Sequence, residues 1–412
     1  MLSLAYKRVF VVLLATGMAL NFFLTWSDWG ELRRGYADFT IFYSAAQIVR
    51  SARGEDLYDV QTQWQAQLAS APDVSIRHGA LPYNHPPFEA LIFVPFTFLP
   101  YFSAYLAWGA VNIAILLIVI WLVRRRSERL RKVSWPVLSL IAFSFFPVFM
   151  CLFQGQDVIL LLLLITGAYT FIKDRSDLKA GLVLGAGMFR PQLVLPLALL
   201  VLCMKRTKRF AAGVVLSTAA MAAVSIAVVG WRSFVAYPKY VWKIERALGN
   251  GAIVPSNMPN LRGLFSFLHE GSLSAFVVTG LSSILLFAYA ARLFRSSQGR
   301  LNLESSFIVA VLVALLVSYH LLIYDLALLF LPLLLIYQEW DAFSNRVFSA
   351  ARSWMVVGPI GFLFCTPLLM WLWLHWAHFN VVAIVLLAWL LGICSFLARE
   401  NARRSEILVT RA

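Results

Sequence analysis

The chain has 412 residues, of which 61% are hydrophobic and 13% are charged, and its mean hydropathy is +0.77. This is more apolar side chain than one soluble core can bury, so the composition excludes an ordinary soluble enzyme. The net charge is +15, which on the surface of a soluble protein would suggest nucleic-acid binding. Here the basic residues stand at the ends of apolar runs, as the positive-inside bias of cytoplasmic loops predicts. We therefore predict an all-α polytopic membrane protein with no nucleic-acid partner.

Apolar runs of nearly twenty residues recur along the chain. Because backbone groups in lipid must hydrogen-bond within their own segment, each run is predicted to be a helix. The whole chain, 1–412, then forms one integral membrane domain with both termini cytoplasmic. Counting between the basic anchors predicts about twelve transmembrane helices, at 9–26, 101–123, 135–152, 157–172, 178–189, 191–204, 210–229, 273–293, 304–319, 324–337, 354–374 and 381–397.

Two long segments, 27–100 and 231–271, fall on the outer face in this topology. The first is polar and is predicted to carry juxtamembrane helices. Its last part, 88–100, is too short to cross the hydrocarbon and is predicted to be interfacial or re-entrant. The second mixes aromatic and basic residues, which suits an amphipathic helix at lipid head groups or a simple aromatic belt. Segment 178–204 breaks after Arg190, and a broken helix is tolerated where it lines a cavity.

Three charged side chains near the predicted outer face are candidates for a functional site. Asp38 comes just before an amphipathic run, so it is predicted at a helix N-terminus, where the helix dipole favours a carboxylate. An ordinary N-cap is the alternative. Arg190 and Arg262 carry guanidinium forks that match phosphate oxygens, although snorkelling to the interface would also explain either arginine.

A second polar group lies near the outer end of a predicted span. The i, i+4 and i+5 spacing of His320, Tyr324 and Asp325 predicts that they share a helical face or its extension. Ionisable groups at that depth are usually functional. His85 stands in a proline-rich turn and could bind a substrate hydroxyl or phosphate, or could fix the loop.

Taken together, these residues form ordered blocks that resemble glycosyltransferase family 87. The blocks are Asp38-Phe39-x-x-Phe42-Tyr43-x-Ala45-Ala46, Leu57-Tyr58-Asp59, Tyr83-Asn84-His85-Pro86-Pro87-Phe88, Gly155-Gln156, Arg190-Pro191-Gln192 and Ser318-x-His320-x-x-x-Tyr324-Asp325-Leu326. The resemblance runs from the first predicted helix to about Pro332. Asp157 stands where the family usually has Asn, and Arg190 where it often has Lys. The resemblance implies a GT-C membrane fold and a polyprenyl-phosphate-mannose-dependent mannosyltransferase.

The resemblance also implies roles for individual residues. Asp38 is expected to be the catalytic base, and Arg190 and Arg262 to bind the donor phosphate. The residues expected to bind substrate are Tyr43, His85, Gln156, His320, Tyr324 and Asp325. One carboxylate is enough for an inverting transfer, because the phosphate leaves with its own charge and needs no proton. A retaining glycoside hydrolase would need two.

The expected partners are a polyprenyl-phosphate sugar donor, a glycolipid or glycan acceptor, and membrane lipids. The expected location is the cytoplasmic membrane, with the active site on the outer side. We expect no cofactor, and the sequence assigns no metal ligands and requires no metal, because it shows no acidic cluster and no Cys/His spacing; metal dependence is left open. A secondary transporter or lipid-linked sugar flippase is the alternative, since transporters also contain broken helices. We find no internal repeat that favours it.

Overall fold

The computed structural model describes residues 4–71, 79–204, 207–246, 254–268, 272–296, 301–339, 350–376 and 380–409. Parts of both predicted outer segments, 72–78, 247–253 and 269–271, lie outside the described residues. The described residues form helices joined by turns and contain no strand. The predicted all-α class is therefore confirmed for this part of the chain.

Five helices among the described residues are long and apolar enough to cross a membrane. They are α1 (Leu4–Ser27), α6 (Tyr101–Arg124), α13 (Lys208–Arg246), α15 (Leu273–Ser296) and α21 (Asn380–Val409). Two bent pairs bring the count to seven if each pair is one span, namely α8 (Trp135–Ser144) with α9 (Phe146–Gln154) and α19 (Ala350–Leu363) with α20 (Thr366–Trp376). Several apolar helices fit a multi-pass membrane protein, while the count of about twelve stays a prediction.

Both bent pairs fall where the sequence analysis expects one span. The α8–α9 pair bends by 71° and the α19–α20 pair by 77°. Pro147 is the second residue of α9, and Pro367 is the second residue of α20. A proline has no N–H for the helix ladder and disfavours helical backbone in the residue before it, so each helix restarts at a new angle.

Shorter helices complete the bundle. They are α10 (Val158–Lys173), α11 (Asp177–Ala186), α12 (Pro191–Cys203), α16 (Leu303–Val317), the 3₁₀ helix η5 (Ile323–Leu329) and α17 (Phe330–Gln338). All residues of α16 from Glu304 to Leu316 are buried, and the helix contacts α12, α15 and α21. The predicted break in 178–204 is confirmed, because α11 ends before Arg190 and α12 starts after it.

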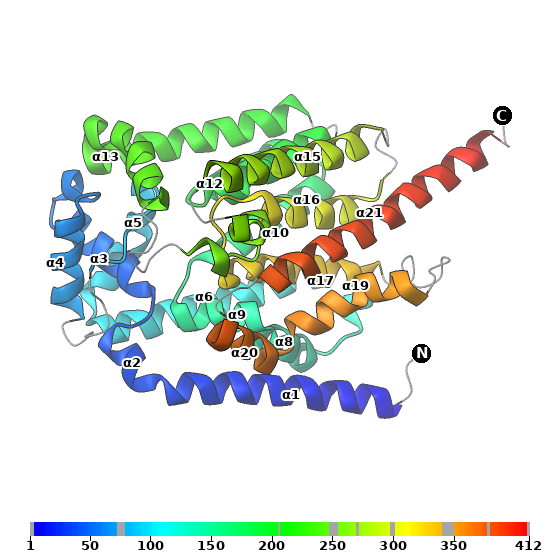
Figure 1. Ribbon diagram of the computed structural model, residues 1–412, viewed down its shortest axis with the longest axis horizontal. Helices are drawn as coiled ribbons and strands as arrows, with labels where there is room; N and C mark the ends of the chain where they lie inside the picture. Colours follow the sequence, from blue (N-terminus) through cyan, green and yellow to red (C-terminus); the bar gives the residue numbers. More distant parts are fainter. Residues whose placement is uncertain are drawn as a thin grey trace.

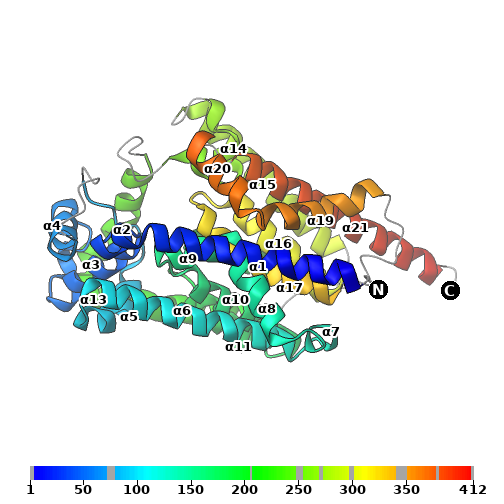
Figure 2. The same cartoon turned by 90° about the horizontal axis from the view of Figure 1, so that it is seen from below.

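The helices of the first polar segment gather at one end of the bundle (Figure 1). They are α2 (Trp29–Arg34), α3 (Phe39–Arg50), η1 (Gly54–Asp56), α4 (Val60–Ser70), α5 (Pro87–Phe93) and η2 (Val94–Phe98). The start of α1 and the end of α21 lie at the opposite end, and Figure 2 shows the same separation from below. The remaining short helices are α7 (Glu128–Arg131), η3 (Pro255–Asn257), α14 (Leu261–Leu264) and η4 (Ser266–Leu268).

Helix α13 joins the predicted span 210–229 to a helix at the start of the second outer segment, where an amphipathic helix was one of two expectations. It continues to Arg246 beyond a kink at Gly230, which has φ 74° and ψ 162°. A positive φ is readily adopted only by glycine, so this residue allows the helix to change direction and resume. The part of α13 after the kink reaches the end of the bundle that holds α3, α4 and α5 (Figure 1). It thereby supplies side chains to a cavity at that end.

Candidate active site

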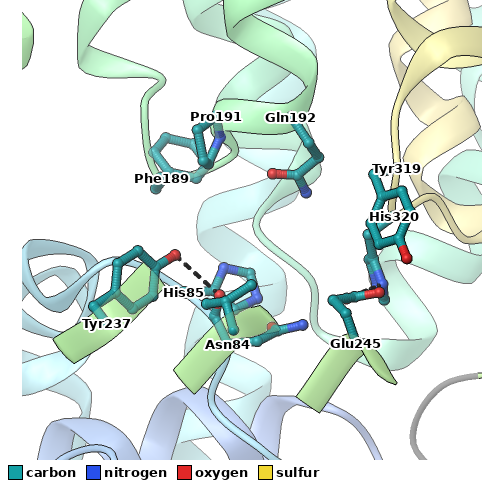
Figure 3. Close-up of a pocket in the computed structure, with 10 residues that line it drawn as sticks. Asn84, His85, Phe189, Pro191, Gln192, Tyr237, Glu245, Tyr319 and His320 are labelled. Carbon is teal, nitrogen blue, oxygen red and sulfur yellow. Dashed lines mark hydrogen bonds and ion pairs between the residues drawn. The ribbon is translucent and has the colours of Figure 1, made fainter. Parts of the chain in front are cut away.

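A cavity of about 200 Å³ lies where four separate chain segments meet (Figure 3). The segments are the turn before α5, the break between α11 and α12, the last turns of α13, and the residues after α16. The lining residues are Asn84, His85, Phe189, Pro191, Gln192, Tyr237, Val241, Glu245, Tyr319 and His320. The cavity is therefore built by tertiary packing, with aromatic rings and a small number of polar groups on its walls.

Asp38 immediately precedes α3, as predicted, but its side chain does not cap that helix. Its carboxylate Oδ2 instead accepts a hydrogen bond of 2.8 Å from Nε2 of Gln156. The Asp38 backbone N–H donates to Oε1 of Gln154 at 3.0 Å. Asp38 is half-buried. The ordinary N-cap role thus does not account for the side chain, which is oriented by Gln156 in the turn after α9.

Gln156 connects this carboxylate to a buried ion-pair network. Its Oε1 accepts a hydrogen bond of 2.7 Å from Nη2 of Arg190. The same guanidinium contacts Asp157 Oδ1 at 2.5 Å and Asp325 Oδ1 at 2.8 Å. Arg190, Asp157 and Asp325 are each at most 2% exposed. A buried charge needs such partners, so this arginine fixes two carboxylates and is linked through one amide to Asp38.

Arg262 belongs to a second ionic group beside the cavity. Its Nη1 lies 2.5 Å from Glu245 Oε2 and donates to the Tyr319 carbonyl oxygen at 3.0 Å. The other Glu245 oxygen, Oε1, lies 2.9 Å from Nδ1 of His320. Figure 3 shows Glu245 and His320 side by side on one wall. Glu245 therefore bridges a guanidinium and an imidazole, and so fixes the position of His320.

His85 lines the cavity and also faces two buried carboxyl groups. Its Nδ1 lies 2.7 Å from Oε2 of Glu89, which is fully buried. Burial, together with the charge of Arg190, lowers the pKa of His85 to about 3, so the ring is neutral at neutral pH. Burial and the neighbouring Asp157 carboxylate raise the pKa of Glu89 well above its usual range.

The comparison with known protein families matches residues 83–318 to glycosyltransferase family 87. This stretch is more than half of the chain and carries the residues on three walls of the cavity. The chain belongs to glycosyltransferase family 87. The resemblance seen in the sequence is confirmed, and the protein is a glycosyltransferase. No curated protein and no solved structure matched the chain.

The structure brings most of the predicted site residues of this family 87 glycosyltransferase to one end of the bundle. His85 and His320 line the cavity. Gln156, Arg190 and Asp325 form the network that reaches Asp38.

Tyr43 is placed differently. Its buried hydroxyl donates to the Leu99 carbonyl oxygen at 2.7 Å. Tyr43 therefore fastens α3 to the chain after η2.

The prediction that one helix carries His320, Tyr324 and Asp325 is wrong. His320 lies in an irregular segment between α16 and η5, and only Tyr324 and Asp325 lie in η5. The Tyr324 ring has the Arg190 guanidinium 5.8 Å from its centre. Asp325 Oδ2 accepts a hydrogen bond from the Leu322 N–H at 2.7 Å, which ends the irregular segment.

Sequence reasoning missed three carboxylates of this glycosyltransferase site. Glu89 stands four residues after His85 where α5 begins, a spacing that could have indicated a side-chain pair. Asp157 follows Gln156 directly and was noticed only as a departure from the family pattern. Glu245 lies among aromatic and basic residues, and nothing in the local sequence marks it as the partner of His320.

Proposed function

We propose that this family 87 protein is an inverting hexosyltransferase with a polyprenyl-phosphate sugar as donor, mannose being the first candidate. The acceptor is a hydroxyl group of a glycolipid or glycan at the outer face of the cytoplasmic membrane. The observation that carries the proposal is the half-buried Asp38 carboxylate, which Gln156 joins to Arg190 at the edge of the cavity. Arg190 directly precedes Pro191 and Gln192, which line that cavity.

In the proposed reaction, Asp38 takes the proton of the acceptor hydroxyl. The acceptor oxygen then attacks the anomeric carbon on the face opposite the phosphate, and the bond from that carbon to the phosphate oxygen breaks. Polyprenyl phosphate leaves with the bonding electron pair and needs no proton, so one base is sufficient. The hydrogen bond from Gln156 holds the carboxylate in one orientation before the substrate arrives.

The leaving phosphate gains charge during this step and needs positive charge nearby. Arg190 and Arg262 are both held by carboxylates, so we assign them to supplying that charge from behind the cavity wall. His85 and His320 are the lining groups that we expect to contact substrate directly.

We assign Gln156 and Asp325 to positioning, the first through Asp38 and the second through Arg190. Tyr324 borders the same guanidinium, and Tyr43 holds α3 in place.

The test is the substitution Asp38→Asn, which keeps the side-chain shape but removes the base. The purified protein is mixed with polyprenyl-phosphate-mannose and a membrane extract as acceptor source, and released polyprenyl phosphate is measured. Losing a general base costs about 10²- to 10⁴-fold in rate, so the variant should bind donor normally and transfer almost none. The matched control is Asp28→Asn, because Asp28 is an exposed aspartate at the end of α1. Transfer by Asp38→Asn at the control rate would contradict the proposal.

The same assay tests the donor sugar. Mannose, glucose and arabinose on one polyprenyl phosphate should give one clearly preferred donor, with mannose expected. Membership of a glycosyltransferase family disfavours the transporter alternative. Release of polyprenyl phosphate from donor in detergent, where no second compartment exists, would separate a transferase from a flippase.

A further inference from the structure

Three ligand-type side chains from distant parts of the chain converge beside the cavity. His85 comes from the turn before α5, Glu89 from the first turn of α5, and Asp157 from the turn before α10. One imidazole nitrogen and one carboxylate oxygen from each acid lie within 4.8 Å of one another. Ligand atoms held about 2.0 to 2.6 Å from one ion have this spread, so the group has the dimensions of a cation site.

Glu89 provides a second, independent observation. Its side chain is fully buried, and within the described part of the chain neither of its oxygens accepts a well-formed hydrogen bond. The contact of 2.7 Å with Nδ1 of His85 is the one ion-pair distance that it makes there. A buried carboxylate without such bonds is costly, so an additional positive charge or a proton is needed at this place.

The local charge balance favours a divalent ion. Glu89, Asp157 and Asp325 are all buried, and Arg190 is the cation that pairs with the two aspartates. Three buried carboxyl groups therefore face one guanidinium, so the group holds more acidic side chains than its single cation can pair with. One doubly charged ion would balance this excess, and one proton would balance it only in part.

We propose that His85, Glu89 and Asp157 bind one divalent cation of the manganese or magnesium type. Two carboxylates and one imidazole, with no thiolate, suit manganese in particular. Nδ1 is the ring nitrogen that faces Glu89, so it is the ligand atom of His85. Because His85 also lines the cavity, the ion lies beside the space that substrate enters.

The role of this ion rests on the proposed function. A lipid-linked phosphate in the cavity would complete its coordination, and the ion would neutralise the charge that the leaving phosphate gains. Neither Arg190 nor Arg262 is among the residues that line the cavity, and each is held by a carboxylate, so the ion would add charge closer to the substrate than these arginines do. Metal binding itself requires no donor and no turnover, so it can be tested separately from the transferase activity.

The experiment equilibrates the full-length protein in detergent with MnCl₂, removes free metal by gel filtration, and counts bound manganese. We expect one ion per chain, displaceable by Mg²⁺, with electron spin-echo modulation from one directly bound nitrogen. Substitution of groups around a metal site weakens binding about 10- to 100-fold, so loss of a direct ligand in Glu89→Gln should cost at least about 100-fold.

The matched control is Glu339→Gln, which changes a partly buried carboxylate far along the chain that is bonded to Asn302. It should keep the wild-type manganese content. If Glu89→Gln fails to fold, His85→Asn provides the second test, because the nitrogen modulation should disappear. Wild-type protein that takes up no manganese, or binds it without a nitrogen ligand, would overturn the proposal and assign a proton to Glu89. Either result leaves the transferase proposal untouched.

Discussion

The bond between Gln156 and Asp38 should control turnover although Gln156 does no chemistry. The substitution Gln156→Leu keeps the approximate length of the side chain and removes the donor that lies 2.8 Å from the Asp38 carboxylate. It also removes one acceptor of Arg190, which keeps its contacts to Asp157 and Asp325. The substitution should therefore mainly disturb the orientation of the Asp38 carboxylate, and the protein should still fold.

The magnitude follows from the type of bond. A hydrogen bond to a charged group contributes about 1.5 to 3 kcal/mol. If all of this is lost in the transition state, kcat falls about 10- to 150-fold, because about 1.4 kcal/mol corresponds to a factor of ten. The apparent affinity for donor should change little, since Asp38 meets the acceptor and not the lipid phosphate in the proposed reaction.

The assay measures release of polyprenyl phosphate at saturating donor, with fluorescence-detected thermal unfolding as a check on folding. Gln154→Leu is the matched control, because this buried glutamine bonds the Asp38 backbone and not its carboxylate. Loss of a neutral bond of about 1 kcal/mol should slow transfer only about fivefold. A folded Gln156→Leu protein with kcat equal to that of the Gln154→Leu control would refute the reasoning.

Four further predictions follow from the structure. Arg190→Met leaves two buried carboxylates unpaired and should lower the free energy of unfolding by about 3 to 5 kcal/mol, measurable as a large fall in Tm, whereas an unchanged Tm would show that the network is not stabilising. Tyr43→Phe removes the bond to Leu99 and should cost about 1 kcal/mol in the same measurement with transfer retained; loss of transfer at normal Tm would instead indicate substrate contact. Gly54→Ala places a methyl group 1.9 Å from the Val228 carbonyl oxygen, so limited proteolysis should show α13 loosened from η1, while an unchanged cleavage pattern would contradict this close approach. EDTA treatment should slow transfer and Mn²⁺ should restore it, and full activity after verified metal removal would exclude a catalytic role for the proposed ion.

Much of the fold could be predicted, because a helix that lies in a membrane needs a long run of apolar residues, and such a run is easily recognised in the sequence. Uninterrupted apolar runs predicted α6 and α15 to within a few residues. The bends between α8 and α9 and between α19 and α20 were missed, because proline near the start of a helix marks a restart but does not state the angle. A helix after Gly230 was one of two expectations, but its direct continuation from the span was not predicted, because the polar sequence there gives no sign of how the two parts are joined.

The candidate site was predictable in part. Asp38, Arg190 and His85 stand out as ionisable or aromatic polar groups beside apolar helices, and their order along the chain resembles a known family. Their partners could not be predicted. Asp157 contacts Arg190, which lies more than thirty residues later in the chain. Glu245 contacts His320, which lies more than seventy residues later.

By itself, the amino-acid sequence determined that this protein is helical, that it is rich in apolar helices, and that it resembles a glycosyltransferase family. These properties follow from composition and local order, which each segment carries independently. The tertiary structure decided that the two arginines are held by carboxylates, that Gln156 orients Asp38, and that His85, Glu89 and Asp157 meet at one point. Contacts of this kind depend on how helices that are far apart in the sequence pack together in space, and no short stretch of sequence contains that information.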